Sequence, residues 1–194
     1  MKHKLKKAAA AGIICELLYF LSVTVFLLTK HDIALTVWEL MTIAGAVVML
    51  VGMLVFSEAY GTGAIPRRLL TVSLAGTVIV TSVAHFTSIG VVRPLAAQGA
   101  AIPEYLKIGT FPSLEMTLDY TAWGFFMGAA FLIMFLGIKE KALKNISAVC
   151  SVLCFIGFVG SFFNENLWYV AVSGYGFGFL IMCIYVLKKP HEKK

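Results

Sequence analysis

The run RLLTVSLAGTVIVTSVAHFTSIGVV at residues 68–92 contains one charged side chain, that of Arg68 at its first position. A helix needs about 20 apolar residues to cross the hydrocarbon core of a membrane, so this run is long enough to span one. Five further apolar runs lie between breaks that contain charged residues or proline. The sequence therefore predicts an all-α integral membrane protein, a single domain over residues 1–194 with six transmembrane helices in one bundle. The predicted spans are 8–29, 36–57, 68–92, 116–138, 145–164 and 167–187.

The composition of the whole chain agrees with these runs. Hydrophobic residues make up 60% of the chain and charged residues 13%, and the mean hydropathy is +0.90. A soluble domain has about half apolar and a quarter charged residues, so we expect the surface to lie in a lipid bilayer. The net charge of +6 comes from lysines in short clusters between apolar runs. Such clusters are typical of cytoplasmic membrane loops, and no nucleic-acid partner is predicted.

Lysine and arginine are distributed unevenly over the segments between the spans. With the N-terminus in the cytoplasm, thirteen of them fall in inner segments, and only Lys30, Arg93 and Lys107 fall in outer ones. Cytoplasmic loops carry the excess of these residues, so we predict a multi-pass protein of the cell membrane with both termini cytoplasmic. The run 8–28 is too long for the apolar region of a signal peptide and is expected to be the first span. The inner residues are Lys2, Lys4, Lys6, Lys7, Arg67, Arg68, Lys139, Lys141, Lys144, Lys188, Lys189, Lys193 and Lys194.

One outer connection, residues 93–115, is predicted to be much longer than the others. Its segment 103–108 could form one turn of interfacial helix with Pro103 at its start. Alternatively, the loop could be a lid over an outward-facing cavity. Every proline is expected to lie in a loop or tail, so that no span is interrupted by one. The prolines are Pro66, Pro94, Pro103, Pro112 and Pro190.

Small residues four positions apart allow helices to approach closely in lipid. Gly124 and Gly128 have this spacing, as do Gly174 and Gly178. We expect both pairs to pack within the bundle, with a homo-oligomer seam on the same faces as the alternative. The four cysteines, all in apolar segments, are expected to be small buried residues rather than disulfide partners. They are Cys15, Cys150, Cys154 and Cys183.

Polar residues recur on one face of the third predicted span. Ser73, Thr77, Thr81, His85 and Ser88 follow one another at intervals of four, four, four and three residues. Such a stripe could line a wet cavity or a proton path. Alternatively, the hydroxyls bond carbonyls of their own helix and pack against neighbours. His85 favours the first interpretation, because an imidazole needs polar partners and titrates near neutral pH.

Other ionisable residues are predicted at the depth of His85, in the outer half of the membrane. Glu39 begins the second span and Arg93 ends the third, while Glu115 and Asp119 lie one helical turn apart at the start of the fourth, with Trp123 one turn deeper. Ionisable residues inside a membrane usually face the bundle interior and mark function, although some of these could be ordinary interfacial charges. The predicted ligand-binding residues are His85, Asp119, Glu39, Trp123, Arg93, Glu115, Thr81 and Ser88.

Glu16 is predicted to lie deeper, on the cytoplasmic side of the first span. It is about eight residues, and so roughly 12 Å, from the inner boundary. No lysine or arginine of a predicted span is at that depth. We expect its carboxyl group to bond hydroxyls such as those of Thr77 or Ser73, in either a proton-coupling site or a buried polar clamp.

Several kinds of chemistry lack their usual residues. A metal hydrolase needs about three histidine and carboxylate ligands, and His85 is the only histidine in a predicted span. With Asp119 and Glu39 it could bind a metal weakly, so no metal site or cofactor is predicted. No catalytic residue is assigned either. The favoured function is binding or transport of a small solute or lipid in an outward-facing pocket. The alternatives are a membrane factor that binds a protein partner, in sensing or immunity, and a lipid-modifying enzyme that uses His85 and Asp119.

Overall fold

A computed structural model describes residues 1–107 and 111–189 of the chain. Six of its helices are long and apolar enough to cross a membrane, and these described ranges contain no strand. The prediction of an all-helical chain with six potential spans is therefore confirmed. The spans are α1 (Lys2–Thr29), α2 (Asp32–Ala59), α3–η1–α4 (Ala64–Thr87, Ser88–Val92, Arg93–Ala97), α5–η3–α6 (Leu114–Asp119, Tyr120–Phe126, Met127–Gly137), α7 (Lys141–Ser161) and η4–α8–η5–α9 (Glu165–Leu167, Trp168–Val172, Ser173–Phe177, Gly178–Lys188).

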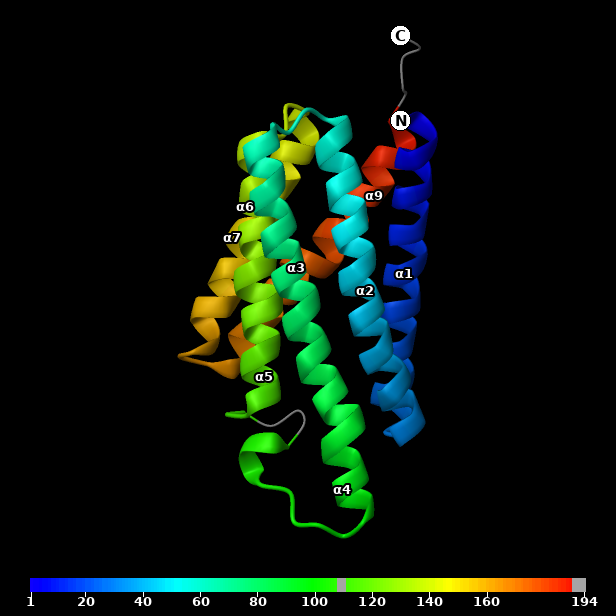
Figure 1. Cartoon of the computed structure of the whole chain (residues 1–194), viewed down its shortest axis with the longest axis vertical. Helices are drawn as coiled ribbons and strands as arrows, with labels where there is room; N and C mark the ends of the chain where they lie inside the picture. Colours follow the sequence, from blue (N-terminus) through cyan, green and yellow to red (C-terminus); the bar gives the residue numbers. More distant parts are fainter. Residues whose placement is uncertain (108–110, 190–194) are drawn as a thin grey trace.

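The helices form one elongated bundle (Figure 1). The beginning of α1 and the end of α9 lie at the same end of it, and the short helix α4 lies at the opposite end (Figure 1). Helix α1 packs against α2 and α9 at the edge of the bundle, while the α3 helix packs between α2 and α6. An even number of spans accounts for the return of the chain to the end where it began.

The third span is longer than predicted, because the helix continues beyond residue 92 through the π-helical turn η1 into α4. In η1 the N–H of Arg93 donates to the carbonyl of Ser88, five residues back. The expectation that every proline lies in a loop or tail is wrong for Pro66 and Pro94. Pro66 is the third residue of α3, where the missing N–H has no helical partner. Pro94 is the second residue of α4, just after the wider π turn η1, the kind of irregularity that accompanies proline inside helices.

The outer connection is correspondingly shorter than predicted, since Arg93 to Ala97 are helical. The 3₁₀ turn η2 (Glu104–Leu106) falls in the segment for which a helical turn or a lid was considered. Residues 108–110 of this loop lie outside the described residues, as does the tail with Pro190, Lys193 and Lys194. The other predicted spans overlap the observed helices and start two to six residues late, because the polar first turns of these helices carry no apolar run.

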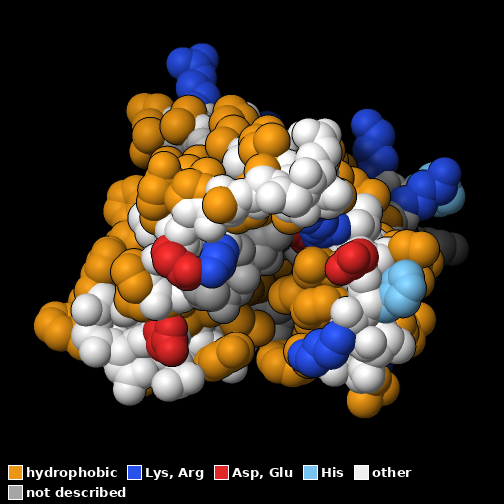
Figure 2. Space-filling view, turned by 90° about the horizontal axis from the view of Figure 1, so that it is seen from below, with side chains coloured by type: hydrophobic (Ala, Val, Ile, Leu, Met, Phe, Trp, Pro, Cys, Tyr) orange, Lys and Arg blue, Asp and Glu red, His pale blue; other side chains and the backbone are white. Residues whose placement is uncertain are grey.

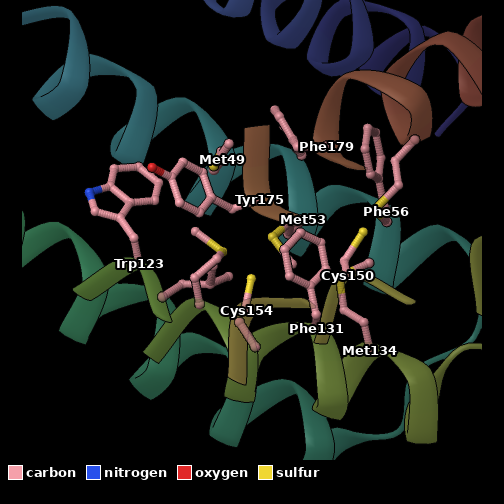
Figure 3. Packing of buried hydrophobic residues seen from close by; sticks show 14 of the residues in the cluster. Met49, Met53, Phe56, Trp123, Phe131, Met134, Cys150, Cys154, Tyr175 and Phe179 are labelled. Carbon is pink, nitrogen blue, oxygen red and sulfur yellow. The ribbon is translucent and has the colours of Figure 1, made fainter. Parts of the chain in front are cut away.

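The core is built from aromatic rings and sulfur-containing side chains. Figure 3 shows Cys150 and Cys154 among Met53, Phe131 and Phe179. All four cysteines are buried and free, as the sequence predicts. Large apolar side chains also cover the outside of the bundle, which lipid can solvate. Examples on the first and third spans are Leu17, Leu21, Val72 and Ile79.

Glycines permit the close approach of α7 to its neighbours. A Cβ atom at Gly124 would lie 2.6 Å from the Cβ of Phe158, and one at Gly178 would lie 2.2 Å from the Sγ of Cys150. Gly128 and Gly174 also face α7. The two glycine faces are thus occupied within the chain, which is the packing that the sequence favours over a seam between copies.

Candidate functional site

A buried ion pair joins the second and third spans near the end of the bundle opposite the termini. Glu39 of α2 is only 1% exposed. Its Oε2 pairs with the guanidinium group of Arg93, and its Oε1 accepts a hydrogen bond from the hydroxyl of Ser88. Arg93 also donates to the hydroxyl of Thr36, which lies three residues before Glu39 on the same face of α2. The extension of the third helix through η1 therefore brings Arg93 to Glu39.

His85 lies between two carboxylates that come from different spans. Its Nδ1 is 3.8 Å from Oε1 of Glu39, and its Nε2 is 3.4 Å from Oδ1 of Asp119. The imidazole is 4% exposed, and neither ring nitrogen has hydrogen-bond geometry with a partner among the described residues. The side chain of Asp119 is 20% exposed, whereas that of Glu39 is 2% exposed. His85 therefore lies between one buried carboxylate and one that is partly exposed.

Glu115 adds a third carboxylate, one turn before Asp119 on α5. Glu39, His85 and Glu115 each offer one oxygen or nitrogen atom, and these three atoms all lie within 4.8 Å of one another. Glu115 and Ser88 also line a small pocket together with Leu106 of η2. Thus a residue of the connection between α4 and α5 lines a pocket that adjoins the charged cluster, which consists of Glu39, His85, Ser88, Arg93, Glu115 and Asp119. Figure 2 shows the molecule from this end, with charged side chains of both signs on the described part of its surface.

Three π-helical turns interrupt the spans. They are η1, η3 and η5, in the third, fourth and sixth spans. Among their side chains, Ser88 bonds Glu39, while Trp123 packs against Tyr175 with ring centroids 4.7 Å apart. π-Helical turns occur frequently at functional sites. Within the described residues, η1 thus contributes Ser88 to the cluster, while η3 and η5 meet each other through Trp123 and Tyr175.

The polar stripe predicted on the third span is buried in the structure, but its members have different partners. All five residues are at most 8% exposed. In the N-terminal part of the stripe, Thr77 donates to the carbonyls of Ser73 (3.3 Å) and Ala122 (3.2 Å), as expected if the hydroxyls serve packing. In its C-terminal part, His85 and Ser88 belong to the charged cluster. The hydroxyl of Thr81, between the two parts, has no hydrogen-bond partner in the described ranges.

Glu16 and Trp123 lie outside the charged cluster and share a second, smaller cavity. Glu16 is 4% exposed, and the cavity has room for about one water molecule. The predicted bonds of Glu16 with Thr77 or Ser73 are not formed, because α1 packs against α2 and α9 and Thr77 bonds backbone carbonyls. The residues that line the cavity are Glu16, Tyr19, Thr42, Gly45, Met49, Trp123 and Tyr175.

Thr36 and Tyr175 were not among the residues predicted from the sequence. For Thr36 a pattern was available, since its spacing of three from Glu39 places the two on one helix face. The position of Tyr175 next to Trp123 depends on how the sixth span packs, and no local sequence pattern predicts it. No protein-family model, curated protein or solved structure matches the chain.

Proposed function

We propose that this chain is a multi-pass protein of the cell membrane that binds or transports a small charged solute in the cluster around Glu39 and His85. The observation that carries the proposal is the burial of Glu39 together with Arg93 in a helix pair that is long and apolar enough to span a membrane. Placing a charge in hydrocarbon costs a few kcal/mol, and such groups generally mark ligand or ion pathways. A purely structural bundle would be as stable with apolar residues at these positions.

The orientation is part of the proposal. Lysines and arginines are concentrated in the segments near the termini, with Lys139 and Lys141 as examples, and are sparse near the charged cluster. The positive-inside rule then assigns both termini to the cytoplasm. On this orientation the cluster lies in the outer half of the membrane, and the pocket beneath Leu106 is the entry from the outside. The cavity that Glu16 lines lies next to the charged cluster, with Thr42 and Trp123 one helical turn from Glu39 and Asp119. Glu16 is therefore proposed as a proton-coupling or buried polar group.

Cysteine labelling in intact cells tests the proposal. The wild type is the background, because its four cysteines are buried. We expect Asp119→Cys to react with a membrane-impermeant thiol reagent, since the Asp119 side chain is partly exposed in the site. Ile79→Cys, which faces lipid from the same bundle at 61% exposure, should not react. Lys139→Cys should react only after the cells are permeabilised. An Asp119→Cys protein that is unreactive from both sides would refute an open site, and Lys139→Cys labelling in intact cells would refute the orientation.

The proximity of His85 and Asp119 favours one second candidate, a lipid-modifying enzyme. In a His–Asp pair the carboxylate orients the imidazole, which can then act as a general base. However, the nearby hydroxyl of Ser88 donates to Glu39 rather than to His85. Loss of lipid turnover in both His85→Asn and Asp119→Asn, with solute binding unaffected, would favour this candidate.

A further inference from the structure

The charged cluster has the chemical composition of a metal site. One nitrogen of His85 and one oxygen each from Glu39 and Glu115 lie within 4.8 Å of one another. Histidine nitrogens and carboxylate oxygens bind Zn²⁺ at about 2.0–2.2 Å, and sites with an open position use three protein ligands. The three atoms are thus close enough to converge on one cation through small side-chain rotations. The residues come from α2, α3 and α5, so the fold rather than a local motif assembles them.

The neighbouring groups hold the candidate ligands in the manner of an outer coordination shell. Arg93 binds Oε2 of Glu39, which leaves Oε1 on the side of His85. Asp119 lies 3.4 Å from Nε2 of His85, where it can accept the proton of that nitrogen and direct Nδ1 towards Glu39. Histidines that bind metals commonly donate their other ring N–H to a carboxylate in this way.

The acidic side chains of the cluster also favour a cation. Glu39 and Glu115 offer carboxylate oxygens, which are ligands for divalent cations. The buried imidazole of His85, which has no hydrogen-bond partner among the described residues, offers a nitrogen ligand beside them.

We propose that Glu39, His85 and Glu115 form a binding site for a divalent transition-metal cation of the zinc class. This inference rests on the proposed function, of which it specifies the ligand. Imidazole suits Zn²⁺, whereas Mg²⁺ and Ca²⁺ favour all-oxygen sites. The site therefore discriminates against the two abundant divalent cations. Arg93, Ser88 and Asp119 are positioning residues in it.

Calorimetric titration of the purified full chain with Zn²⁺ tests the site. We expect one ion bound per chain, no competition from millimolar Mg²⁺ or Ca²⁺, and an affinity at least about 100-fold lower in His85→Asn, since a ligand is lost. The matched control is His31→Asn. His31 is an exposed histidine at the same end, where it caps α2, and asparagine is an equally good cap. This control should bind Zn²⁺ as the wild type does.

Two further measurements keep the test decisive. If His85→Asn does not fold, Glu115→Gln replaces it, because Glu115 is only partly buried and its loss should also lower the Zn²⁺ affinity. In the wild type, bound Co²⁺ should give visible absorption bands that zinc abolishes. Absence of Zn²⁺ binding at millimolar concentration would overturn the proposal, as would equal weakening by His31→Asn. The titration does not depend on sidedness and the labelling uses no metal, so a failure of the metal site can be distinguished from a failure of the proposed function.

Discussion

His85 and Asp119 meet across the interface of α3 and α5, with Nε2 of the imidazole 3.4 Å from Oδ1 of the carboxylate. On the other side of the ring, Nδ1 faces Glu39 at 3.8 Å. Each ring nitrogen is therefore directed at a carboxylate from a different span. The contact with Asp119 occupies Nε2 and leaves Nδ1 as the ring nitrogen that is available to a ligand.

The first prediction concerns Asp119 as the group that orients His85. Asp119→Asn should lower the affinity for Zn²⁺ about 10- to 100-fold, as the loss of outer-shell carboxylates does elsewhere. The number of ions bound should remain one, because the three proposed ligands are retained. Calorimetry on the purified variant measures both quantities. Glu165→Gln, which alters an exposed carboxylate near the same end, is the control. Unchanged affinity in Asp119→Asn would show that Asp119 has no positioning role.

The second prediction concerns the ion pair of Glu39 and Arg93. Arg93→Met should destabilise the protein by about 3–5 kcal/mol, because it leaves the Glu39 carboxylate buried without its counter-charge. The double variant Glu39→Gln with Arg93→Met should be more stable than Arg93→Met alone. Unfolding in detergent, followed for both single variants and the double variant, gives the coupling energy. Additive effects would mean that the two charges do not interact.

The third prediction concerns the contact of α7 with α8. A Cβ atom at Gly157 would lie 2.4 Å from the backbone nitrogen of Ala171, and a backbone atom cannot move aside as a flexible side chain can. Gly157→Ala should therefore destabilise the protein by about 1–3 kcal/mol. Gly45→Ala is the matched control, since no atom lies within 4 Å of its added Cβ. It should be neutral or stabilising by up to about 1 kcal/mol. Equal effects of the two changes on the melting temperature would contradict this packing.

The fourth prediction concerns pH and the end of the bundle near the termini. There Glu140, between α6 and α7, accepts a hydrogen bond from Tyr185 (2.6 Å) and pairs with Lys189. The hydrogen bond of Lys189, and then that of Tyr185, lower the pKa of Glu140 below its ordinary value of 4.5. A lowered pKa in the folded state means that the stabilisation is complete above pH 4.5 and is lost as the pH falls through the folded value.

Consequently, the melting temperature of the wild type should fall more steeply below pH 4.5 than that of Glu140→Gln. Above that pH the variant should be less stable by up to about 1 kcal/mol, because the pair is partly exposed. Thermal unfolding at a series of pH values provides the comparison. Parallel curves for the two proteins would rule out a contribution from Glu140.

The six spans and the polar face of the third helix could be predicted from the sequence because both depend on local periodicity. Run length identifies a helix that can span a membrane, and a spacing of three to four residues places Ser73 and His85 on one face. Both residues are buried in the structure. The shared depth of Glu39, Arg93 and Asp119 could also be predicted, from their positions at or near the ends of the predicted spans.

The contacts among these residues could not be predicted, because they depend on irregularities and on the order of helix packing. Reading apolar runs ends a span at the first charged residue, so Arg93 was assigned to a loop. The π turn η1 instead continues the helix and brings Arg93 to Glu39. Similarly, the position of Glu16 depends on α1 packing against α2 and α9 rather than on the third span, which no pattern within α1 reveals.

A crystal structure of the protein purified from its native membrane would show directly whether Glu39, His85 and Glu115 hold a ligand. We expect non-protein density bounded by these three side chains, with anomalous scattering at the zinc absorption edge and contacts of about 2.0–2.2 Å to them. A closed cluster would refute the metal site: no density between the side chains, and Nδ1 of His85 hydrogen-bonded directly to Glu39.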